Sequence, residues 1–433
     1  MTTDQPDSPP RRTVLVVGAN GFLGGYVAAA CAAAGWRVLR GIRAARREDE
    51  RAADLAHMAR AADWHASLRG VDAVVNAAGI LREAGSQTFD AIHVDGPLAL
   101  AQACVDCGVP AFVQISALGQ PQDGGFIASK HRFDTALVAL PLRAVVLRPS
   151  VVFATGGSYG GTSLLRALAA FPGFQLMPGQ GQWPIQPLAA EDLATLVAKS
   201  LDSDHRGIFE VGGPRPMPLR DYQARWRRWL RIDGDKVLAV PMPLVAIHVG
   251  LSEWLGRGPI GATMWRMLQR GNVTSEDAWA RLQSHFGFAP RDLAEVLAVH
   301  PSQVQDRWQA QLYFLAPTMR ITVIALWLLS AVVGWITPAS QILALTDASF
   351  LHTLAPVELA RATASLDALL AVWLATRWRP RWALGLMGIS VLAYTALFGT
   401  LLPALWLDPP GGLAKNLVVL PALAVLWVLV DRR

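Results

Sequence analysis

One short stretch near the N-terminus restricts the fold more than any other part of the sequence. Residues 14–17 are four consecutive apolar residues, and glycines follow at positions 18, 21 and 24. We predict a buried strand, a tight turn and then an alanine-rich helix over 26–34. Glycines let the backbone approach a pyrophosphate, and the helix N-terminus supplies free N–H groups and a favourable dipole. The stretch therefore predicts a nucleotide phosphate site.

Apolar runs and helical patterns alternate through the first half of the chain. Strand-like runs recur at residues 36–42, 71–80, 110–116, 142–148 and 209–214. Helical patterns separate them, and a weaker third strand is expected to end at Asp54 and Leu55. Because strands that alternate with helices form βαβ units, we predict an α/β fold with a doubly wound parallel sheet.

Arginines follow the second predicted strand, where a dinucleotide fold reads the adenosine ribose. Arg43, Arg46 and Arg47 lie just past this strand, and no acidic residue falls at its end. An acidic residue would pair with the ribose 2′-hydroxyl of NAD, whereas arginine accommodates a 2′-phosphate. We expect NADP as the cofactor, with Arg43 in contact with it and NAD as the alternative. Otherwise the arginines form a solvated loop.

Five motifs together carry a resemblance to a known superfamily. They are Gly18-Ala19-Asn20-Gly21-Phe22-Leu23-Gly24, Asn76-Ala77-Ala78-Gly79, Ile115-Ser116-Ala117-Leu118-Gly119, Lys130 and Leu147-Arg148-Pro149-Ser150. Over residues 13–316 the chain resembles an extended or atypical short-chain dehydrogenase/reductase, and it is similar to the branch of the complex I accessory subunit and isoflavone-reductase-like proteins. The resemblance implies an epimerase/dehydratase-like Rossmann domain. The implied cofactor contacts are Gly18, Asn20, Gly21, Phe22, Leu23, Gly24, Arg43, Asp54, Leu55, Ala77, Ala78, Gly79, Ser116, Lys130 and Pro149.

The catalytic residues that the resemblance implies are incomplete in this sequence. The superfamily uses a serine, a tyrosine and a lysine, in which the phenol transfers a proton while hydride moves to or from the nicotinamide. Ser116 and Lys130 match, but the tyrosine position, four residues before the lysine, is Phe126. Tyr159, in the loop after the sixth strand, is a candidate replacement acid. His131 is expected to be structural.

Phenylalanine can neither donate nor accept the proton, so catalysis by the usual mechanism is in doubt. Hydride transfer to an acceptor that needs no enzymatic acid, such as a flavin or quinone, would survive the change. Loss of catalysis would leave a nucleotide-sensing or scaffolding module. Whether the chain is an enzyme therefore stays open at this point.

The composition points to a membrane segment at the far end of the chain. Hydrophobic residues make up 52% of the sequence and charged residues 17%, which is too apolar for a wholly soluble protein. Uncharged runs cover 321–336, 383–407 and 417–430, and a weaker run covers 357–376. Arginines cluster at 377–381 and at 432–433, and only four spans place both clusters and the large domain on one side. We predict four transmembrane helices.

The loop over residues 407–417 resembles the corresponding stretch of DoxX-like four-helix membrane domains, and this resemblance covers 318–433. Asp367 would be an ionisable group inside a span, which is costly unless it is paired. Arg361 is too far round the same helix to be its partner. We expect Asp367 to make an interhelical contact or to belong to a quinone or proton site.

The expected organisation is a disordered tail at 1–12, a nucleotide-binding domain at 13–216, a helical cap at 217–316 and a membrane domain at 317–433. The N-terminus lacks the apolar segment of a signal peptide. Three cysteines fit a reducing compartment and argue against a disulfide framework. No metal site or nucleic-acid motif is predicted.

These features predict a membrane-anchored NAD(P)-binding oxidoreductase-like protein. We expect it in the inner (cytoplasmic) membrane as a multi-pass protein, with the N-terminal domain and the C-terminus cytoplasmic. It would act on a lipophilic or quinone-like acceptor at that membrane face. The alternatives are an inactive nucleotide-sensing or scaffold subunit of a membrane redox complex, and a bundle whose activity the nucleotide domain regulates.

Overall fold

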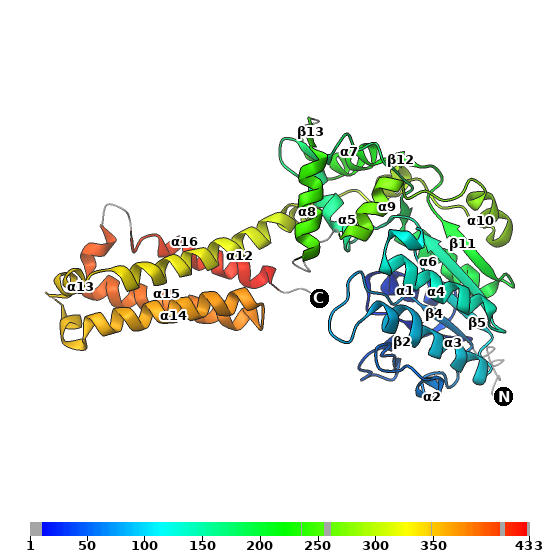
Figure 1. Cartoon of the computed structure of the whole chain (residues 1–433), viewed down its shortest axis with the longest axis horizontal. Helices are drawn as coiled ribbons and strands as arrows, with labels where there is room; N and C mark the ends of the chain where they lie inside the picture. Colours follow the sequence, from blue (N-terminus) through cyan, green and yellow to red (C-terminus); the bar gives the residue numbers. More distant parts are fainter. Residues whose placement is uncertain (1–10, 235, 255–260, 348, 408–411, 431–433) are drawn as a thin grey trace, which may run out of the picture. The chain divides into compact units, whose positions relative to one another are not determined.

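The computed structural model describes residues 11–234, 236–254, 261–347, 349–407 and 412–430. The chain divides into two compact units, Met1–Ala310 and Gln311–Arg433 (Figure 1). Ten residues of the expected N-terminal tail, 1–10, lie outside the described residues. At its end, Arg12 already belongs to the first unit, because its side chain pairs with Asp202 and lies over the ring of Trp36.

A seven-stranded sheet forms the centre of the first unit, with the strand order β11-β6-β5-β4-β1-β2-β3. All of its neighbouring strands are parallel. The strands are β1 Thr13–Val17, β2 Arg37–Ile42, β3 Glu50–Ala52, β4 Ala73–Asn76, β5 Ala111–Ile115, β6 Arg143–Pro149 and β11 Gly207–Val211. The strand order reverses between β1 and β4, which is the switch point of a doubly wound sheet. The predicted α/β fold is confirmed.

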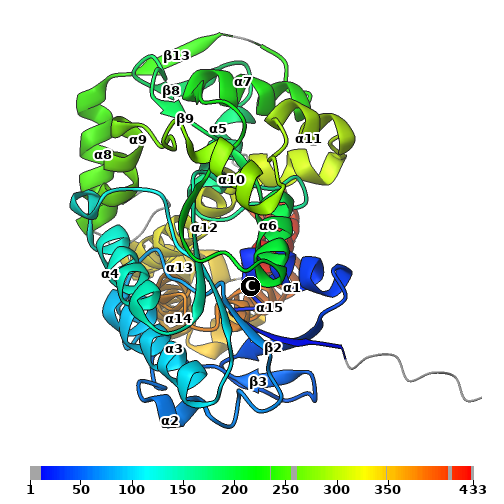
Figure 2. The same cartoon turned by 90° about the vertical axis from the view of Figure 1, so that its right-hand side faces the viewer.

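Helices cover both faces of this sheet, as Figure 2 shows. Helices α1 (Phe22–Ala33) and α6 (Ala190–Asp202) pack on one face, where Val27, Cys31 and Leu196 join the buried core. Helices α3 (Gly96–Asp106) and α4 (Gly125–Ala139) pack on the other face, together with the short α2 (Ala61–Trp64). Continuous apolar strands are the pattern expected of a parallel sheet buried on both sides.

Two sequence-based boundaries in this unit are wrong. The third strand ends at Ala52, before Asp54, because the Asp54 carboxylate bonds to the Ala56 N–H and the His57 ring and closes a turn there. The first helix begins at Phe22, four residues earlier than predicted. Gly24 and Gly25 lie inside the first turn of this helix.

A second cluster of elements forms a cap within the first unit. Its helices are α5 Gly161–Ala169, α7 Leu219–Trp229, α8 Met242–Trp254, α9 Ala262–Arg270 and α11 Leu293–Val299, whereas α10 Ala278–Phe286 packs on β11 and α6 of the sheet. Its strands pair two by two: β10 (Leu188–Ala189) with β7 (Val152–Phe153), β12 (Met217–Pro218) with β9 (Pro184–Ile185), and β13 (Val237–Val240) with β8 (Gln175–Pro178). Trp183, Tyr222, Trp226 and Trp265 form its core. Tryptophans from several elements thus meet in the cap, which also draws on strands before residue 217.

The second unit is helical. It comprises α12 (Val304–Ile336, which begins in the first unit), α13 Ala339–Thr346, η3 Phe350–Leu354, α14 Pro356–Thr376, α15 Pro380–Leu401, η4 Pro403–Trp406 and α16 Asn416–Leu429. Three of these helices, α12, α14 and α15, are long and apolar enough to cross a membrane. Helix α16 is apolar but has 14 residues, fewer than the roughly 20 that a straight span needs. The four-span topology therefore stays a prediction.

The third expected span, 383–407, ends earlier than predicted. Helix α15 stops at Leu401, and Leu402 leaves the helical conformation before Pro403. A residue that precedes proline is disfavoured in the helical region, so this proline terminates the helix. The apolar sequence continues past it as the short turn η4 and masks the boundary.

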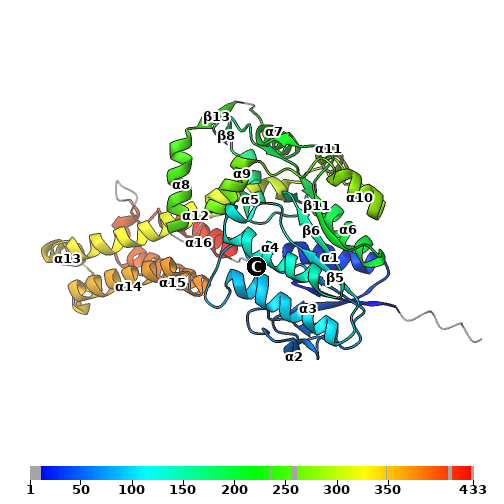
Figure 3. The ribbon, with the colours of Figure 1, turned by 45° about the vertical axis from the view of Figure 1, so that its right-hand side comes forward.

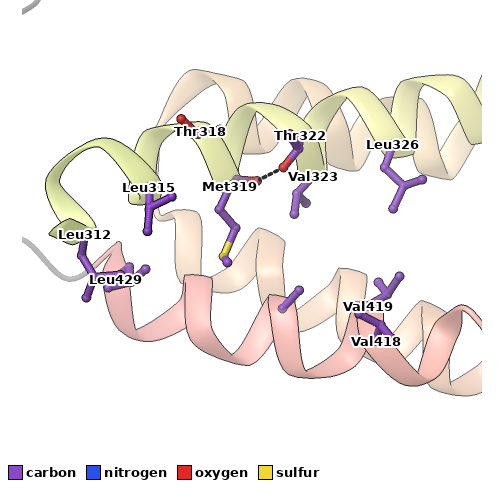
Figure 4. Close-up of a pocket in the computed structure, with 11 residues that line it drawn as sticks. Leu312, Leu315, Thr318, Met319, Thr322, Val323, Leu326, Val418, Val419 and Leu429 are labelled. Atoms are coloured by element: carbon purple, nitrogen blue, oxygen red, sulfur yellow. Dashed lines mark hydrogen bonds between the residues drawn. The ribbon is translucent and has the colours of Figure 1, made fainter. Parts of the chain in front are cut away.

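An apolar groove of about 410 Å³ runs between α12 and α16 within the second unit (Figure 4). Its lining residues are Leu312, Leu315, Thr318, Met319, Thr322, Val323, Leu326, Val418, Val419, Ala422 and Leu429. The two threonine hydroxyls donate to carbonyls of their own helix, at Phe314 and Met319. The groove therefore offers an apolar surface to whatever fills it.

Candidate nucleotide site

The glycine turn between β1 and α1 is held in a conformation that other residues could not adopt. Gly18 has φ +79°, and a Cβ there would lie 3.0 Å from the backbone of Ala78. A Cβ on Gly24 would lie 2.0 Å from the Gly18 carbonyl oxygen. The turn is closed by a hydrogen bond from the Gly21 N–H to the Gly18 carbonyl, 2.8 Å. These close approaches bring the start of α1 against the end of β1, as a phosphate cradle requires.

The N-terminus of α1 has the features of an anion site. Gly21 is its N-cap and makes no side-chain cap hydrogen bond, and the first turn holds no acidic residue. The first N–H groups of a helix have no partner within the helix, and they carry the positive end of its dipole. Phe22, Leu23 and Gly24 supply the backbone of this turn, so the predicted phosphate-contacting residues lie together.

The remaining predicted contacts lie at the carboxyl ends of neighbouring strands. Ala77 and Ala78 follow β4, where the Ala77 N–H donates to the Val17 carbonyl, 3.0 Å. Pro149 ends β6, and its carbonyl accepts from the Leu118 N–H, 2.9 Å. A ligand of a doubly wound sheet binds in the crevice outside these strand ends.

Asp54 and Leu55 follow β3 at the same edge, but their side chains are used within the protein. The Asp54 carboxylate closes its own turn, and Leu55 is buried in the core under α3. A Cβ on Gly96 would lie 2.4 Å from the Leu55 carbonyl oxygen, so α3 packs directly on this backbone. The Asp54 backbone is engaged as well, because its carbonyl accepts from the N–H groups of His57 and Met58. Of the two side chains, only that of Asp54 keeps some exposed surface for a ligand.

An arginine that the sequence reasoning missed reaches the glycine turn from β2. The Arg40 guanidinium donates to the Ala19 carbonyl, 3.1 Å, and to the Asn20 side-chain oxygen, 2.8 Å. Arg43, the predicted contact, is exposed one residue past the strand. Arg47 instead pairs with Asp49. Arg40 lies inside the strand, so its position in the sequence gave no sign that its side chain would extend to the turn.

Phe126 lies in an aromatic cluster on α4, where the superfamily that the chain resembles has its tyrosine. Its ring makes edge contacts with Phe89 and His93, with centroids 6.3 Å and 5.6 Å away. Lys130 lies one turn later on the same helix, and its Nζ is 6.0 Å from the Phe126 ring centroid. The lysine and the ring therefore share a face, as the four-residue spacing predicts.

Lys130 is buried and donates to the Ile115 carbonyl, 3.1 Å. Burial lowers the pKa of Lys130 to about 8, against the opposing effect of Asp134. A Cβ on Gly79 would lie 3.3 Å from the Lys130 Nζ, so this amine lies directly under the loop after β4. The structure thus brings Gly79, Ser116 and Lys130 together at the carboxyl ends of β4 and β5.

Ser116 has its hydroxyl engaged below the site. It donates to the Asp134 carboxylate, 2.7 Å, and the Arg148 Nε donates to the same oxygen, 2.8 Å. Burial raises the pKa of Asp134, while Ser116 and Arg148 oppose this shift. A hydroxyl has a single hydrogen to donate. In this arrangement Ser116 can accept a hydrogen bond from a ligand but cannot also donate one to a substrate oxygen.

His93 is a second residue that the sequence reasoning missed. It lies in the π-helical turn η1 (Ala91–Asp95), a type of turn that often occurs at functional sites. Its Nε2 accepts from the Ile80 N–H, 3.0 Å, so its Nδ1 carries the hydrogen and donates to Ser129, 2.9 Å. Burial and the Lys130 charge lower the pKa of His93 to about 2, which keeps the ring neutral. No spacing or neighbouring residue in the sequence distinguished it from a structural histidine.

Tyr159 lies beside the glycine turn and not beside Phe126. Its side chain is 58% exposed and stacks on the Phe22 ring, with centroids 6.3 Å apart. The buried Arg166 holds the same loop by donating to the Gly157 carbonyl, 3.0 Å. Tyr159 as a replacement acid stays a prediction, and no contact places its phenol at the tyrosine position. His131 is engaged in the protein framework, with Nε2 3.1 Å from the Ala117 carbonyl oxygen.

In the second unit, Asp367 makes a hydrogen bond between helices. Its carboxylate on α14 accepts from the Ser330 hydroxyl on α12, 2.7 Å. Its other oxygen is buried without a hydrogen-bond partner among the described residues. Arg361 donates to the carbonyls of Gly334, Trp335 and Thr337 at the end of α12. Of the two expectations for Asp367, the interhelical contact is present.

The described residues contain no group of three or more histidine, cysteine, aspartate or glutamate side chains that could hold a metal ion.

Comparisons with known proteins divide the chain in the same way. Residues 14–212 match the NAD dependent epimerase/dehydratase family, and residues 324–427 match the DoxX-like family. No curated protein matches the chain.

Solved structures share the fold of the first unit. The UDP-N-acetylglucosamine 4-epimerase of Bacillus cereus is 16% identical, with a TM-score of 0.50, and covers 67% of this chain and 100% of its own. A UDP-glucose 4-epimerase of Thermotoga maritima is 14% identical, with a TM-score of 0.50, and covers 66% of this chain and 96% of its own. The protein gox2253 is 19% identical, with a TM-score of 0.51 over 66% of this chain and 96% of its own. At these identities the likeness shows the fold alone.

Proposed function

Taking the chain as an NAD-dependent epimerase/dehydratase-like domain joined to a DoxX-like membrane domain, we propose that it binds NADP(H) and passes hydride to a lipophilic, quinone-like acceptor at the cytoplasmic membrane face. The observation that supports the proposal is the cradle at Gly18 and Gly24, where a side chain on either glycine would collide with neighbouring backbone and push α1 away from the strand ends. Ala78, Gly79 and Lys130 continue the site toward the position of the nicotinamide ribose.

The residues present fit a dinucleotide. Free N–H groups at the α1 N-terminus would bind the pyrophosphate, and Lys130 would bind a ribose hydroxyl. Arg40 and Arg43 would face the adenosine end, where their charge favours the 2′-phosphate of NADP. A bound nicotinamide would supply a hydride. This chain would position it beside the half-buried ring of Phe126.

A quinone-like acceptor suits a site that lacks the phenol. Reduction of a quinone by NADPH consumes one further proton and yields the hydroquinone and NADP⁺. The quinone oxygen becomes a stabilised phenolate that takes its proton from water, so no acid is required at the Phe126 position. A simple carbonyl gives a far more basic alkoxide, which needs a positioned acid.

The membrane position of this activity is also a proposal. The arginines at 377–381 and 432–433 favour four spans, with the first unit and the C-terminus in the cytoplasm and the protein in the inner (cytoplasmic) membrane. A substrate that partitions into the bilayer would then be available at the same face.

One observation favours a second candidate, a nucleotide-sensing or scaffold subunit of a membrane redox complex. The Ser116 hydroxyl donates its hydrogen to Asp134, and the side chain of Phe126 has no polar atom. Neither position therefore offers a hydrogen-bond donor to a substrate carbonyl in this arrangement. Nucleotide binding would persist in such a subunit, whereas turnover would not.

A matched pair of glycine variants tests the cradle. In the detergent-purified full chain, Gly24→Ala should weaken NADPH binding at least tenfold, because its Cβ would meet the Gly18 carbonyl. Gly25→Ala is the control, since nothing lies within 4 Å of the Cβ it would add. Binding is measured by titration with NADPH and NADH. Equal affinities in the two variants, or no binding of either nucleotide to the unmodified chain, would overturn the proposal.

Turnover separates the two candidates. NADPH oxidation is followed in the unmodified chain with a soluble quinone, a flavin and a simple carbonyl as acceptors. We expect oxidation with the quinone. Binding without oxidation by any acceptor would leave the sensing or scaffold subunit.

A further inference from the structure

Helix α8 is apolar on two opposite faces. Its inner face packs on the cap core, where Val249 is buried and Met242 and Val245 contact it. Its outer face carries Leu244, Ile247 and Leu251, which are 56%, 66% and 50% exposed. Between Met242 and Ser252 the only ionisable residue is His248. An amphipathic helix on a water-facing surface would place polar residues on the outer face, so this face lacks its partner.

We propose that α8 lies in the headgroup region of the bilayer and that its outer face is covered by lipid. The spacing of Leu244, Ile247 and Leu251 places all three on one side of the helix, as in helices that lie along a membrane surface. Each side chain would leave water for the acyl-chain boundary, which is the transfer that drives interfacial binding.

The chain itself supplies the reason to commit to lipid. Helix α12 is continuous from Val304, in the first unit, to Ile336, and it is one of the three helices able to cross a membrane. The first unit is therefore tethered to a bilayer by a helix. Such a tether gives the first unit a high effective concentration at the bilayer surface. An apolar face that binds lipid only weakly is then covered by lipid without a second anchor.

Helix α8 is also joined to the rim of the nucleotide site. The Glu253 carboxylate accepts from the Ala262 N–H, 3.0 Å, at the start of α9, which Figure 3 shows beside α8. The Ser252 carbonyl accepts from Arg82, 3.2 Å, in the loop after β4.

Helix α9 in turn fastens the rim next to Phe126. Its Arg270 pairs with Asp123, 2.9 Å, and its Thr263 contacts the Gly124 backbone closely enough to leave no room for a Cβ there. A lipid-covered α8 would give an apolar molecule in the bilayer a route to the site without crossing water. This last step rests on the proposed function, whereas the lipid contact does not.

The test places a fluorophore on the outer face. The full chain, with the exposed Cys107 changed to serine, is reconstituted in phosphatidylcholine nanodiscs with and without doxyl-labelled lipid. Bimane is attached to Ile247→Cys or, as a control, to Gln283→Cys on α10, which is also exposed. We expect doxyl lipid to quench the label at 247 at least twofold more than the label at 283. Equal quenching at both positions would overturn the proposal.

A second variant guards against a fluorophore that inserts by itself. Leu244→Glu and Leu251→Glu, added to the labelled chain, should reduce the quenching to the level of the control, since charged groups resist entry into lipid. Unchanged quenching would show that the dye and not α8 contacts the bilayer. Disulfide cross-linking between two chains through Ile247→Cys, without quenching, would assign the face to a second copy and also overturn the proposal. NADPH binding, measured in the same samples, reports separately on the proposed function.

Discussion

At the scale of single residues, the candidate site differs from a complete dehydrogenase site by very few atoms. Phe126 keeps the ring and loses the oxygen, and Ser116 keeps the hydroxyl but donates it to Asp134. Lys130 remains under the loop after β4, with its pKa lowered to about 8 by burial. The residues that we propose to hold a nucleotide thus lie together, while those that would move a proton are altered.

Returning the oxygen tests whether the rest of the site is competent. Phe126→Tyr places a phenol on the same face of α4 as Lys130, whose charge would favour the phenolate. We expect NADPH-dependent reduction of a simple ketone to rise at least tenfold, in line with the usual contribution of a positioned acid. Phe89→Tyr, in the same aromatic cluster, is the control and should give no increase. Intact NADPH binding with no gain would indicate that Ser116 limits the site.

The lowered pKa of Lys130 predicts a pH dependence of nucleotide binding. The amine is charged below about pH 8 and neutral above it, and only the charged form makes a charge-assisted hydrogen bond to the ribose. Raising the pH from 7 to 9.5 should therefore weaken NADPH binding roughly tenfold, which corresponds to about 1.4 kcal/mol. Titrations in Lys130→Met should show no such change over this range. A flat profile in the unmodified chain would contradict the assigned role of the amine.

At the scale of elements, the central strands β1, β4, β5 and β6 were predictable because each one is short, largely apolar and buried. The sequence could not reveal where side chains cross between elements. Arg40 reaches the glycine turn from inside β2, and His93 reaches Ile80 from η1, and neither contact follows from local pattern. Two elements also end earlier than predicted. Helix α15 ends at Leu401, before Pro403, and β3 ends at Ala52, before the turn that Asp54 closes. Local sequence therefore located the central strands, and tertiary packing determined which side chains meet at their ends.

The hydrogen bond between α12 and α14 should stabilise the membrane unit. Ser330→Ala removes the donor to Asp367 and should lower the free energy of unfolding by about 0.6–2 kcal/mol, the range found for interhelical hydrogen bonds in membranes. Ser365→Ala is the matched control, because its hydroxyl bonds to the Arg361 carbonyl of its own helix. Thermal unfolding of the reconstituted variants measures the difference. Equal losses in the two variants would show that the contact between helices contributes nothing.

At the scale of the whole molecule, the side of the membrane on which the chain ends depends on helix α16. Helices α12, α14 and α15 are long enough to span, whereas α16 has 14 residues and contains Pro421. Three spans would place the two ends of the membrane segment on opposite sides, and four spans would place them together. The two arginine clusters favour four spans, whereas the length of α16 favours three. Whether α16 crosses the membrane therefore decides which compartment holds the C-terminus.

A reporter resolves this conflict directly. We expect a fusion after Arg433 to report the cytoplasm, because the positive-inside rule places the basic clusters there. A fusion in the loop after α15 should report the opposite side. An external signal from the C-terminal fusion would contradict the four-span arrangement and would make α16 a helix that does not cross.

The groove between α12 and α16 has a practical consequence for anyone who purifies this protein. Where two helices of a bundle leave a groove between them, the lipid or detergent around the protein fills it and makes the van der Waals contacts that side chains do not. A detergent with a bulky or rigid tail would fill the groove differently from a flexible phospholipid chain. The measured stability of this bundle would then be a property of protein and solvent together, and it would change with the choice of detergent even when the sequence does not.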